Sequence, residues 1–192
     1  MKRMALLLAA LLTMGTASRA QDVYELDKAH MEIGFTISHL VISEVKGRFN
    51  DFAGTITLGA DNTPLAAEAV IQAASIDTAV AKRDEHLRNE DFFHVEKYPT
   101  ITFVGKKVER EGDRWVMVGD FTMHGVTKEI RLPFTIKGPI KDPWGNTRIG
   151  LKAETTLNRK DYGLTWNKVL EAGGLAVGET VNIQIRGEAV KK

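Results

Sequence analysis

Histidines are the residues of this chain whose type suits metal binding or proton transfer, and there are five of them: His30, His39, His86, His94 and His124. Neighbouring metal ligands stand at i, i+2 on a strand or at i, i+4 on a helix, and no two of these histidines have either spacing. His30 and His39 are nine residues apart. An extended strand would separate them by about 30 Å. The sequence therefore predicts neither a metal site nor a metal cofactor.

Nucleophilic and phosphate chemistry have little support in the same chain. It contains no cysteine, and no serine lies in the G-x-S-x-G pattern that exposes a catalytic hydroxyl. Ser38 and His39 are adjacent on a predicted strand, so their side chains point to opposite faces and cannot pair. Gly173-Gly174 lacks the Lys and Ser or Thr that complete a phosphate loop. One enzymatic alternative stays open, in which His39 or His86 acts as a general acid or base on a hydrophobic substrate, because imidazole titrates near neutral pH.

Length and charge suit a globular chain with no nucleic-acid partner. The chain has 192 residues and a formal net charge of +1. Without Lys2, Arg3 and Arg19, which lie in the first twenty positions, 23 basic and 25 acidic residues remain, a net charge of −2. A nucleic-acid-binding domain would show a basic stripe instead. The absence of cysteine also excludes a disulfide-stapled fold and a Cys-ligated zinc or iron–sulfur site.

Residues 1–20 have the pattern of a secretory signal peptide. The basic pair Lys2-Arg3 precedes the apolar run Ala5–Leu12, and Ser18-Arg19-Ala20 places small residues at the −3 and −1 positions of a cleavage site. The apolar run is about half as long as a bilayer span, and no later segment is apolar enough to be a membrane anchor. We therefore expect cleavage, export to the periplasm and a single mature domain over residues 21–192.

After residue 20, apolar and polar residues alternate with the period of two that is typical of strands with one buried face. The sets predicted to share a face are Met31, Ile33, Phe35, Ile37, His39 and Val41; Trp115, Met117, Phe121 and Met123; Val126, Ile130, Leu132, Phe134 and Ile136; Ile149, Leu151, Ala153, Thr155 and Leu157; and Val181, Ile183, Ile185 and Ala189. Shorter runs lie at 54–58, 66–76 and 101–108. Tight turns such as His124-Gly125 separate the runs, so consecutive strands should pair antiparallel. About eight such strands hide their apolar faces by closing into an all-β, up-and-down antiparallel barrel.

One segment departs from the alternation, because residues 78–90 are mostly adequate helix formers. Asp77 or Thr78 is the predicted cap at its start, and Tyr98-Pro99 is predicted to stop it. The segment 160–178 is predicted to be a long loop that contains a helical turn. The barrel should thus carry one or two short helices.

Short motifs along the whole chain resemble those of the YceI-like family of exported lipid-binding barrels. The matching stretches are Tyr24-Glu25-Leu26-Asp27-Lys28-Ala29-His30, Phe35-Thr36-Ile37-Ser38-His39-Leu40, Val45-Lys46-Gly47-Arg48-Phe49, Ser75-Ile76-Asp77-Thr78, Arg83-Asp84-Glu85-His86-Leu87-Arg88, Asp91-Phe92-Phe93, Tyr98-Pro99-Thr100-Ile101-Thr102-Phe103, the run 118–127, and Arg159-Lys160-Asp161-Tyr162-Gly163. The resemblance implies an extended, lipocalin-like antiparallel barrel that is often dimeric, so a homodimer is one expected assembly. It also implies an apolar pocket for a long-chain isoprenoid or a similar amphiphile, such as a quinone tail, and no settled enzymatic activity.

A barrel of about eight strands can be filled by its own side chains or can hold one small ligand. The cluster of small residues Ala66, Ala67, Ala69, Ala73 and Ala74 favours a cavity. By facing and position, the candidate lining is Phe35, Ile37, His39, Phe49, Phe52, Ile56, Leu87, Phe92, Phe103, Phe121, Phe134 and Trp166. Arg83 and His86 belong to a basic cluster beside Phe92 and are the candidates for contact with a polar or anionic lipid head.

The sequence therefore predicts a periplasmic carrier or storage protein for an isoprenoid-like lipid, without a cofactor and without enzymatic activity. Two alternatives stay open beside it. One is the histidine-dependent enzyme described above. The other is a filled barrel that acts through its surface, as a stress or interaction module.

Overall fold

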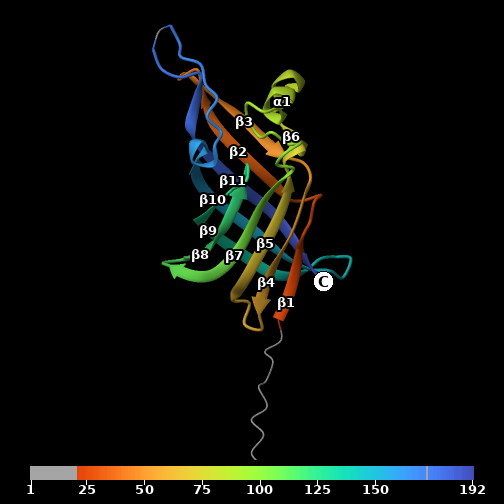
Figure 1. The fold of residues 1–192 in the computed structure, drawn as a ribbon. Helices are drawn as coiled ribbons and strands as arrows, with labels where there is room; N and C mark the ends of the chain where they lie inside the picture. The colour runs from red at the N-terminus through yellow and green to blue at the C-terminus, as the bar shows by residue number, and fades with distance from the viewer. Residues whose placement is uncertain (1–20, 172) are drawn as a thin grey trace, which may run out of the picture.

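Strands make up most of the computed structural model, which describes residues 21–171 and 173–192 (Figure 1). They are β1 (Gln21–Leu26), β2 (Glu32–His39), β3 (Ser43–Phe49), β4 (Phe52–Gly59), β5 (Pro64–Gln72), β6 (Ile76–Asp77), β7 (Thr100–Glu111), β8 (Arg114–Met123), β9 (Val126–Lys141), β10 (Thr147–Asn158) and β11 (Val177–Lys191). The helix α1 (Ala81–Arg88) and the 3-10 turns η1 (Ala73–Ser75) and η2 (Arg159–Tyr162) complete the described elements. The predicted signal peptide, residues 1–20, lies outside the described residues.

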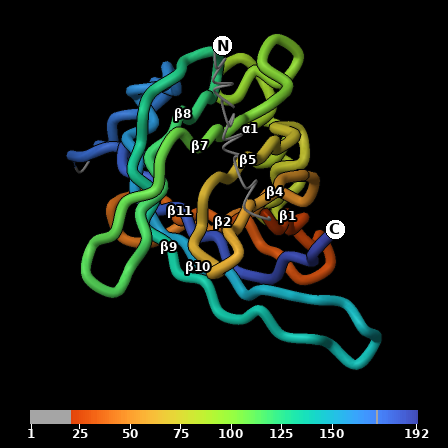
Figure 2. The backbone as a smooth tube through the Cα atoms, turned by 90° about the horizontal axis from the view of Figure 1, so that it is seen from below, coloured from red at the N-terminus to blue at the C-terminus, as the bar shows by residue number. Residues whose placement is uncertain are grey.

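Eight strand positions form a closed ring, because three positions are each shared by two strands. β1 and β2 lie end to end along β11, with Leu26 opposite Ala189 and Ile33 opposite Ile185. On their other side, β4 pairs with β1 and β3 pairs with β2, and next to these β5 pairs with β4 and β6 pairs with β3. β7, β8, β9, β10 and β11 complete the ring, which Figure 2 shows from below. Each of these pairings between the described strands is antiparallel. The predicted all-β antiparallel barrel of about eight strands is confirmed.

The interior of the barrel holds side chains that the alternation predicted to face inward. Phe134 of β9, Leu157 of β10 and Ile183 of β11 all contribute to it. The hairpin between β8 and β9 turns at His124 and Gly125, whose φ angles are 52° and 75°. Two left-handed residues are what a two-residue type I′ turn requires, and histidine tolerates that region better than most side chains. The hairpin predicted from His124-Gly125 is therefore confirmed.

The helix α1 is shorter than the predicted 78–90, and its predicted cap is wrong. Thr78 does not cap it; instead the Asp84 carboxylate accepts hydrogen bonds from the Thr78 N–H (2.9 Å) and from its hydroxyl (2.5 Å). The Asp77 carboxylate accepts from the N–H of Ala79 (2.9 Å), where the backbone turns with a φ of 62° before the helix begins. The short polar side chains thus stabilise this preceding turn rather than the first turn of the helix. The helix ends at Arg88, well before Tyr98-Pro99.

The two ends of the barrel differ. At one end, Tyr24, Leu58 and Ile149 are at most 1% exposed and pack into one cluster. At the other end, the β2–β3 turn and the segment between η2 and β11 project beyond the ring (Figure 1). The described residues of that segment, 163–171 and 173–176, form no helix or strand apart from one isolated bridge between Val169 and Leu175, in agreement with the loop predicted over 160–178. Within the described chain, neither α1 nor the 3-10 turns have the length and hydropathy of a membrane span.

Candidate ligand-binding cavity

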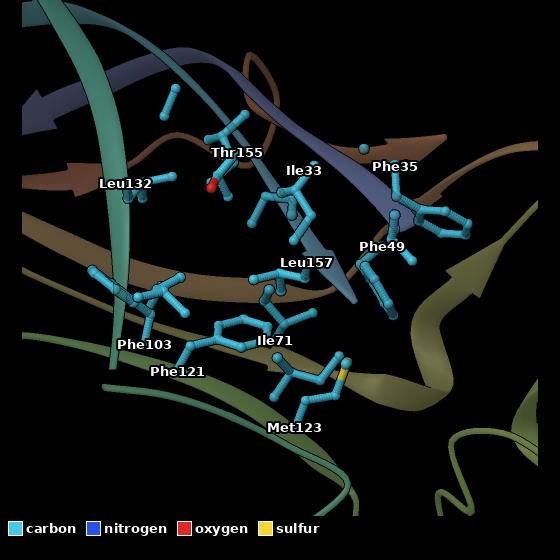
Figure 3. A pocket seen from close by; sticks show the side chains of 18 of the residues that line it. Ile33, Phe35, Phe49, Ile71, Phe103, Phe121, Met123, Leu132, Thr155 and Leu157 are labelled. Atoms are coloured by element: carbon cyan, nitrogen blue, oxygen red, sulfur yellow. The ribbon is translucent and has the colours of Figure 1, made fainter. Parts of the chain in front are cut away.

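The barrel encloses an apolar cavity of about 240 Å³. Its wall is built from the inward faces of the strands, as Figure 3 shows for Phe103 of β7, Phe121 of β8, Leu132 of β9 and Leu157 of β10. Each of these side chains is inward-facing because alternate residues of a strand point to opposite faces of the sheet. The cavity is therefore a direct consequence of the alternation, closed by the ring of strands.

The cavity is closed at one end and approaches solvent at the other. Ile56, Met117 and Phe134 of its lining belong to the buried cluster that fills the β1 end of the barrel. Toward the opposite end the lining continues through Ile37 and Val177, which are partly exposed. A ligand would therefore enter from the end that carries the β2–β3 turn and the loop before β11.

Aromatic rings pack against one another along the β2–β3 wall of the cavity. The ring centroids of Phe35 and Phe49 are 6.0 Å apart, and Phe49 meets Phe93 edge to face at 5.8 Å. On the other side, Phe121 meets Tyr162 edge to face at 5.5 Å. Such contacts hold large rings in defined positions, so the wall has a fixed shape rather than a loosely filled one.

Most of the predicted lining residues lie in the wall of this cavity. They are Phe35, Ile37, Phe49, Ile56, Leu87, Phe92, Phe103, Phe121 and Phe134. Ala67 and Ala69, from the small-residue cluster, also line it and leave space on the β5 side. Whether each of these residues contacts a ligand stays a prediction.

Three predicted lining residues lie outside the wall. Phe52 is buried in the core at the start of β4. His39 is the last residue of β2, opposite Ser43 and Val177, beyond the point where the strand borders the cavity. Trp166 lies behind Phe92, with ring centroids 5.2 Å apart. Position along the strand, which alternation does not reveal, places His39 beyond the lining, and loop packing places Trp166 behind it.

The two residues predicted to contact a lipid head, Arg83 and His86, have partners within the protein. Arg83 donates to the hydroxyl and the carbonyl of Thr78, at 2.7 Å and 2.8 Å. His86 Nε2 is 2.9 Å from the Asp91 carboxylate, and its ring packs edge to face on Trp166 at 5.0 Å. Neither side chain lines the cavity, and neither does His39. Proton transfer by His39 or His86 to a substrate in the cavity would therefore require the side chain to move.

Arg159 lines the open end of the cavity and was missed by sequence reasoning. It is 2% exposed, and its guanidinium donates to the backbone carbonyls of Gly178 (2.8 Å), Leu164 (2.5 Å) and Trp166 (2.9 Å). Burial lowers the pKa of this group, and within residues 21–171 and 173–192 no carboxylate forms an ion pair with it. Arg159 therefore fastens the loop after η2 to the start of β11. No residue spacing in the sequence predicts this role, because the acceptors of Arg159 are backbone carbonyls.

One cluster of metal-ligating types lies at the closed end, where the sequence predicted no metal site. Ligand atoms of Asp27, His30 and Glu188 lie within 4.8 Å of one another. The Arg148 guanidinium donates to the Asp27 and Glu188 carboxylates at 2.6 Å and 3.1 Å, so a cation already balances them. Asp142 also accepts from Arg148 at 2.7 Å. The donor set is therefore an ion-pair network that joins β10 to β11 and to the β1–β2 loop.

An eight-stranded antiparallel barrel with an apolar cavity belongs to the class of barrels that can hold one small hydrophobic ligand, as lipocalins do. The chain is a member of the YceI-like family, because the YceI-like domain matches residues 24–189. The family resemblance inferred from the motifs is thereby confirmed.

Similar proteins cover nearly the same length. A UPF0312 protein of Pseudomonas putida is 38% identical over 187 residues, which are 95% of this chain and 93% of that protein. A YceI protein of Campylobacter jejuni, 35% identical, superposes with a TM-score of 0.69 over 87% of this chain and 96% of its own. A polyisoprenoid binding domain from Saccharophagus degradans has a TM-score of 0.66 over 88% of this chain and 98% of its own. At 18% identity, that domain shares the fold.

Proposed function

We propose that this chain is a periplasmic carrier that holds the apolar tail of a long-chain isoprenoid, or of a similar amphiphile such as a quinone, in the barrel cavity. The observation that carries the proposal is the apolar wall of the cavity, contributed by strands all around the ring. Transfer of tail surface from water into such a wall is favourable by about 25 cal/mol per Å². The ordering of a flexible tail offsets a substantial part of this gain.

The open end of the cavity is the proposed position of the head group. A polar head would be costly to desolvate among the aliphatic and aromatic side chains of the interior. His86 packs edge to face on Phe92 of the lining, with ring centroids 5.0 Å apart, and Arg83 lies one helical turn before Leu87 of the lining in α1. In this proposal a rearrangement of α1 and the following loop brings both side chains to the head. The tail would then point toward the closed end.

Two independent features support the ligand class and the location. A solved domain with the same fold is described as polyisoprenoid binding, which favours an isoprenoid over other apolar ligands. The basic start, apolar run and small-residue cleavage pattern of residues 1–20 favour export. Cell fractionation with intact-mass measurement tests the location, and a periplasmic species beginning at Gln21 is the expected result.

Native mass spectrometry tests the carrier proposal directly. The wild-type protein should carry an added lipid mass or take up an isoprenoid tail offered in excess. Phe103→Glu and Ile37→Glu place a charge in the wall and should abolish that load. Val104→Glu is the matched control, because Val104 is the next residue of β7 and is 53% exposed. An empty wild-type protein that takes up no tail would favour the filled barrel, and an unchanged load in folded Phe103→Glu would contradict the assigned lining.

The homodimer implied by the family resemblance forms part of the proposal. Analytical ultracentrifugation of the purified protein, with and without lipid, tests it. A species of twice the mass of the chain is the expected result, and a monomer at all concentrations would contradict it.

A further inference from the structure

Four aliphatic side chains project into solvent at the open end of the barrel. Leu40, Val41 and Ile42 form the turn between β2 and β3, and Val169 lies in the loop that leads to β11. Ile42 is 86% exposed and Val169 is 80% exposed, which is unusual for side chains of this size. We call these four residues the apolar tip.

Two residues of the apolar tip hold a backbone conformation that is costly for them. Leu40 has a φ of 53° and Val41 a φ of 66°, both in the left-handed region. Asparagine and glycine are favoured at such turn positions, and a β-branched residue such as valine is an outlier there. The aliphatic side chains therefore weaken the turn that carries them. A feature that costs stability at an exposed site points to a role in binding.

The apolar tip stands beside the mouth of the cavity. The N–H of Leu40 donates to the carbonyl of Ala176 at 2.8 Å, so the β2–β3 turn is tied to the loop that carries Val169. Ile37, three residues before Leu40, and Val177, next to Ala176, both line the cavity. Figure 1 shows the two segments projecting together beyond the ring of strands. Whatever covers the tip therefore lies next to the point where a tail would enter.

A lipid bilayer fits the apolar tip better than a second protein surface does. A stable protein interface buries roughly 800 Å² on each partner. Four aliphatic side chains offer less than that, since each is smaller than an aromatic residue, which buries about 150–250 Å². The flanking residues Glu44, Lys46, Lys168 and Glu171 have charges that cancel, so they offer no charged complement to a protein partner. Insertion into lipid gains free energy in proportion to the apolar area removed from water, so even a small apolar tip gains from it without a charged complement.

We propose that the apolar tip inserts into the outer part of a lipid bilayer and holds the mouth of the cavity against it. An isoprenoid tail could then pass between membrane and barrel with little exposure to water. This inference rests on the proposed carrier function, because it gives the tip the task of loading and unloading the same cavity.

Co-sedimentation with vesicles of phosphatidylethanolamine and phosphatidylglycerol tests the inference. The double variant Val41→Ser with Ile42→Ser should bind these vesicles at least about tenfold more weakly, since full burial of even one such side chain is worth about tenfold in transfer from water. Ile140→Ser is the matched control: Ile140 is 64% exposed but lies next to Arg148, which pairs with Val190 at the far end of β11. It should bind like the wild type. Added salt should change the binding of the wild type little, because the charges of the flanking Glu44, Lys46, Lys168 and Glu171 cancel.

Val41→Gly separates membrane binding from folding. Glycine adopts a φ near 66° without strain, so the melting temperature should stay at or above that of the wild type. Vesicle binding should nevertheless fall several-fold, because an inserting side chain is gone. A Val41→Gly variant that binds vesicles as well as the wild type would contradict the inference.

Native mass spectrometry of the same variants distinguishes this inference from the carrier proposal. Offered an isoprenoid tail in excess, the double variant should take it up like the wild type while it loses vesicle binding. Wild-type vesicle binding by the double variant would overturn the role of the tip and leave the carrier intact. An empty wild-type protein would overturn the carrier itself. Loss of a dimer in the double variant, with vesicle binding retained, would identify the tip as a contact with a second copy and overturn the membrane role.

Discussion

The ring of Phe35 occupies the space above Gly47, its partner in register across β2 and β3. A Cβ built on Gly47 would fall 2.4 Å from Cζ of Phe35 and 2.9 Å from Cγ2 of Thr78. Any larger residue at position 47 must therefore displace the phenyl ring. Because Phe35 lines the cavity, a displaced ring alters the space proposed for the ligand.

Gly47→Ala should therefore reduce the capacity of the cavity while keeping the fold. The expected loss in the free energy of unfolding is about 1–3 kcal/mol, the usual range for overpacking. The bound lipid mass should shift to shorter tails or disappear in native mass spectrometry. Gly150→Ala is the control, because a Cβ there meets only Lys137 at an ordinary contact distance of 3.7 Å. A wild-type lipid load in Gly47→Ala would show that Phe35 does not border the ligand.

Arg159→Met should loosen the loop at the mouth of the cavity. The substitution leaves three backbone carbonyls without their donor, at an expected loss of about 2–4 kcal/mol in the free energy of unfolding. Hydrogen exchange should rise over residues 163–168. Arg159→Lys should recover little of the lost stability, because one ammonium group cannot reach the several acceptors that the planar guanidinium with its five N–H donors reaches. Lys160→Met, which removes an exposed ion pair with Glu179, should cost less than about 1 kcal/mol. Equal losses in Arg159→Met and Lys160→Met would contradict this account.

Arg148→Met should change the stability of the protein mainly at neutral pH. Hydrogen bonds from Arg148, and then from His30, lower the pKa of Asp27 from 3.8 to about 2. Arg148 also holds the pKa of Asp142 well below its ordinary value. A carboxyl group whose pKa is lower in the folded than in the unfolded protein stabilises the fold when the pH is above its unfolded pKa. This stabilisation is lost as the pH falls through its folded pKa.

The melting temperatures of Arg148→Met and the wild type should therefore differ most near neutral pH and converge as pH falls from 3.8 toward about 2. Thermal unfolding followed by circular dichroism across this range measures the difference. Arg186→Met removes the exposed ion pair with Glu154 and should change the melting temperature little at any pH. A difference between Arg148→Met and the wild type that does not depend on pH would contradict the assigned network.

His124→Asn should flatten the dependence of stability on pH on the acidic side of neutrality. His124 Nδ1 donates to the carbonyl of Tyr162 at 3.1 Å, while Nε2 is buried without a partner among the described residues. Burial therefore lowers the pKa of His124 from 6.5. A histidine whose pKa is lower in the folded than in the unfolded protein stabilises the fold when the pH is above its unfolded pKa. This stabilisation is lost as the pH falls from the unfolded pKa toward the folded pKa.

Asparagine suits the φ of 52° at this position and does not titrate. His124→Asn should lose about 1 kcal/mol at neutral pH, because the contact with the Tyr98 ring at 4.4 Å disappears. The difference in stability between His124→Asn and the wild type should become smaller as pH falls below 6.5. A melting profile as steep as that of the wild type would show that His124 is not the group responsible.

Alternation along the chain determined which residues of the long strands face the interior. Phe103, Phe121 and Phe134 were predicted to line a cavity and do lie in its wall. The direction of a strand side chain depends only on its own backbone, so a period of two is readable without knowledge of the neighbours. The hairpin at His124-Gly125 was predictable for the same reason, because φ preference is local.

Predictions that depended on packing were less successful. Val116 and Val118 lie on the outer face of β8, yet they are at most 2% exposed. Lys107 and Arg131 lie opposite Val118 in register, where their aliphatic stems can cover it. Likewise, the sequence did not show that Arg83 and His86, predicted to contact a lipid head, have Thr78 and Asp91 as hydrogen-bond partners within the protein. An alternating pattern carries no information about which side chain covers another.

Closure of the barrel and the shape of its two ends were decided only by the tertiary structure. Tyr24 of β1 pairs in register with Lys191 of β11, and Arg148 donates to Asp27, which is 121 positions away in the sequence. Arg159 reaches carbonyls of a loop whose course no local signal predicts. Such contacts depend on the register of eight strand positions at once, and register is a long-range property set by closure of the ring. The sequence by itself therefore determined the apolar inner face, whereas the tertiary structure decided that this face encloses a cavity, closed at one end and open at the other.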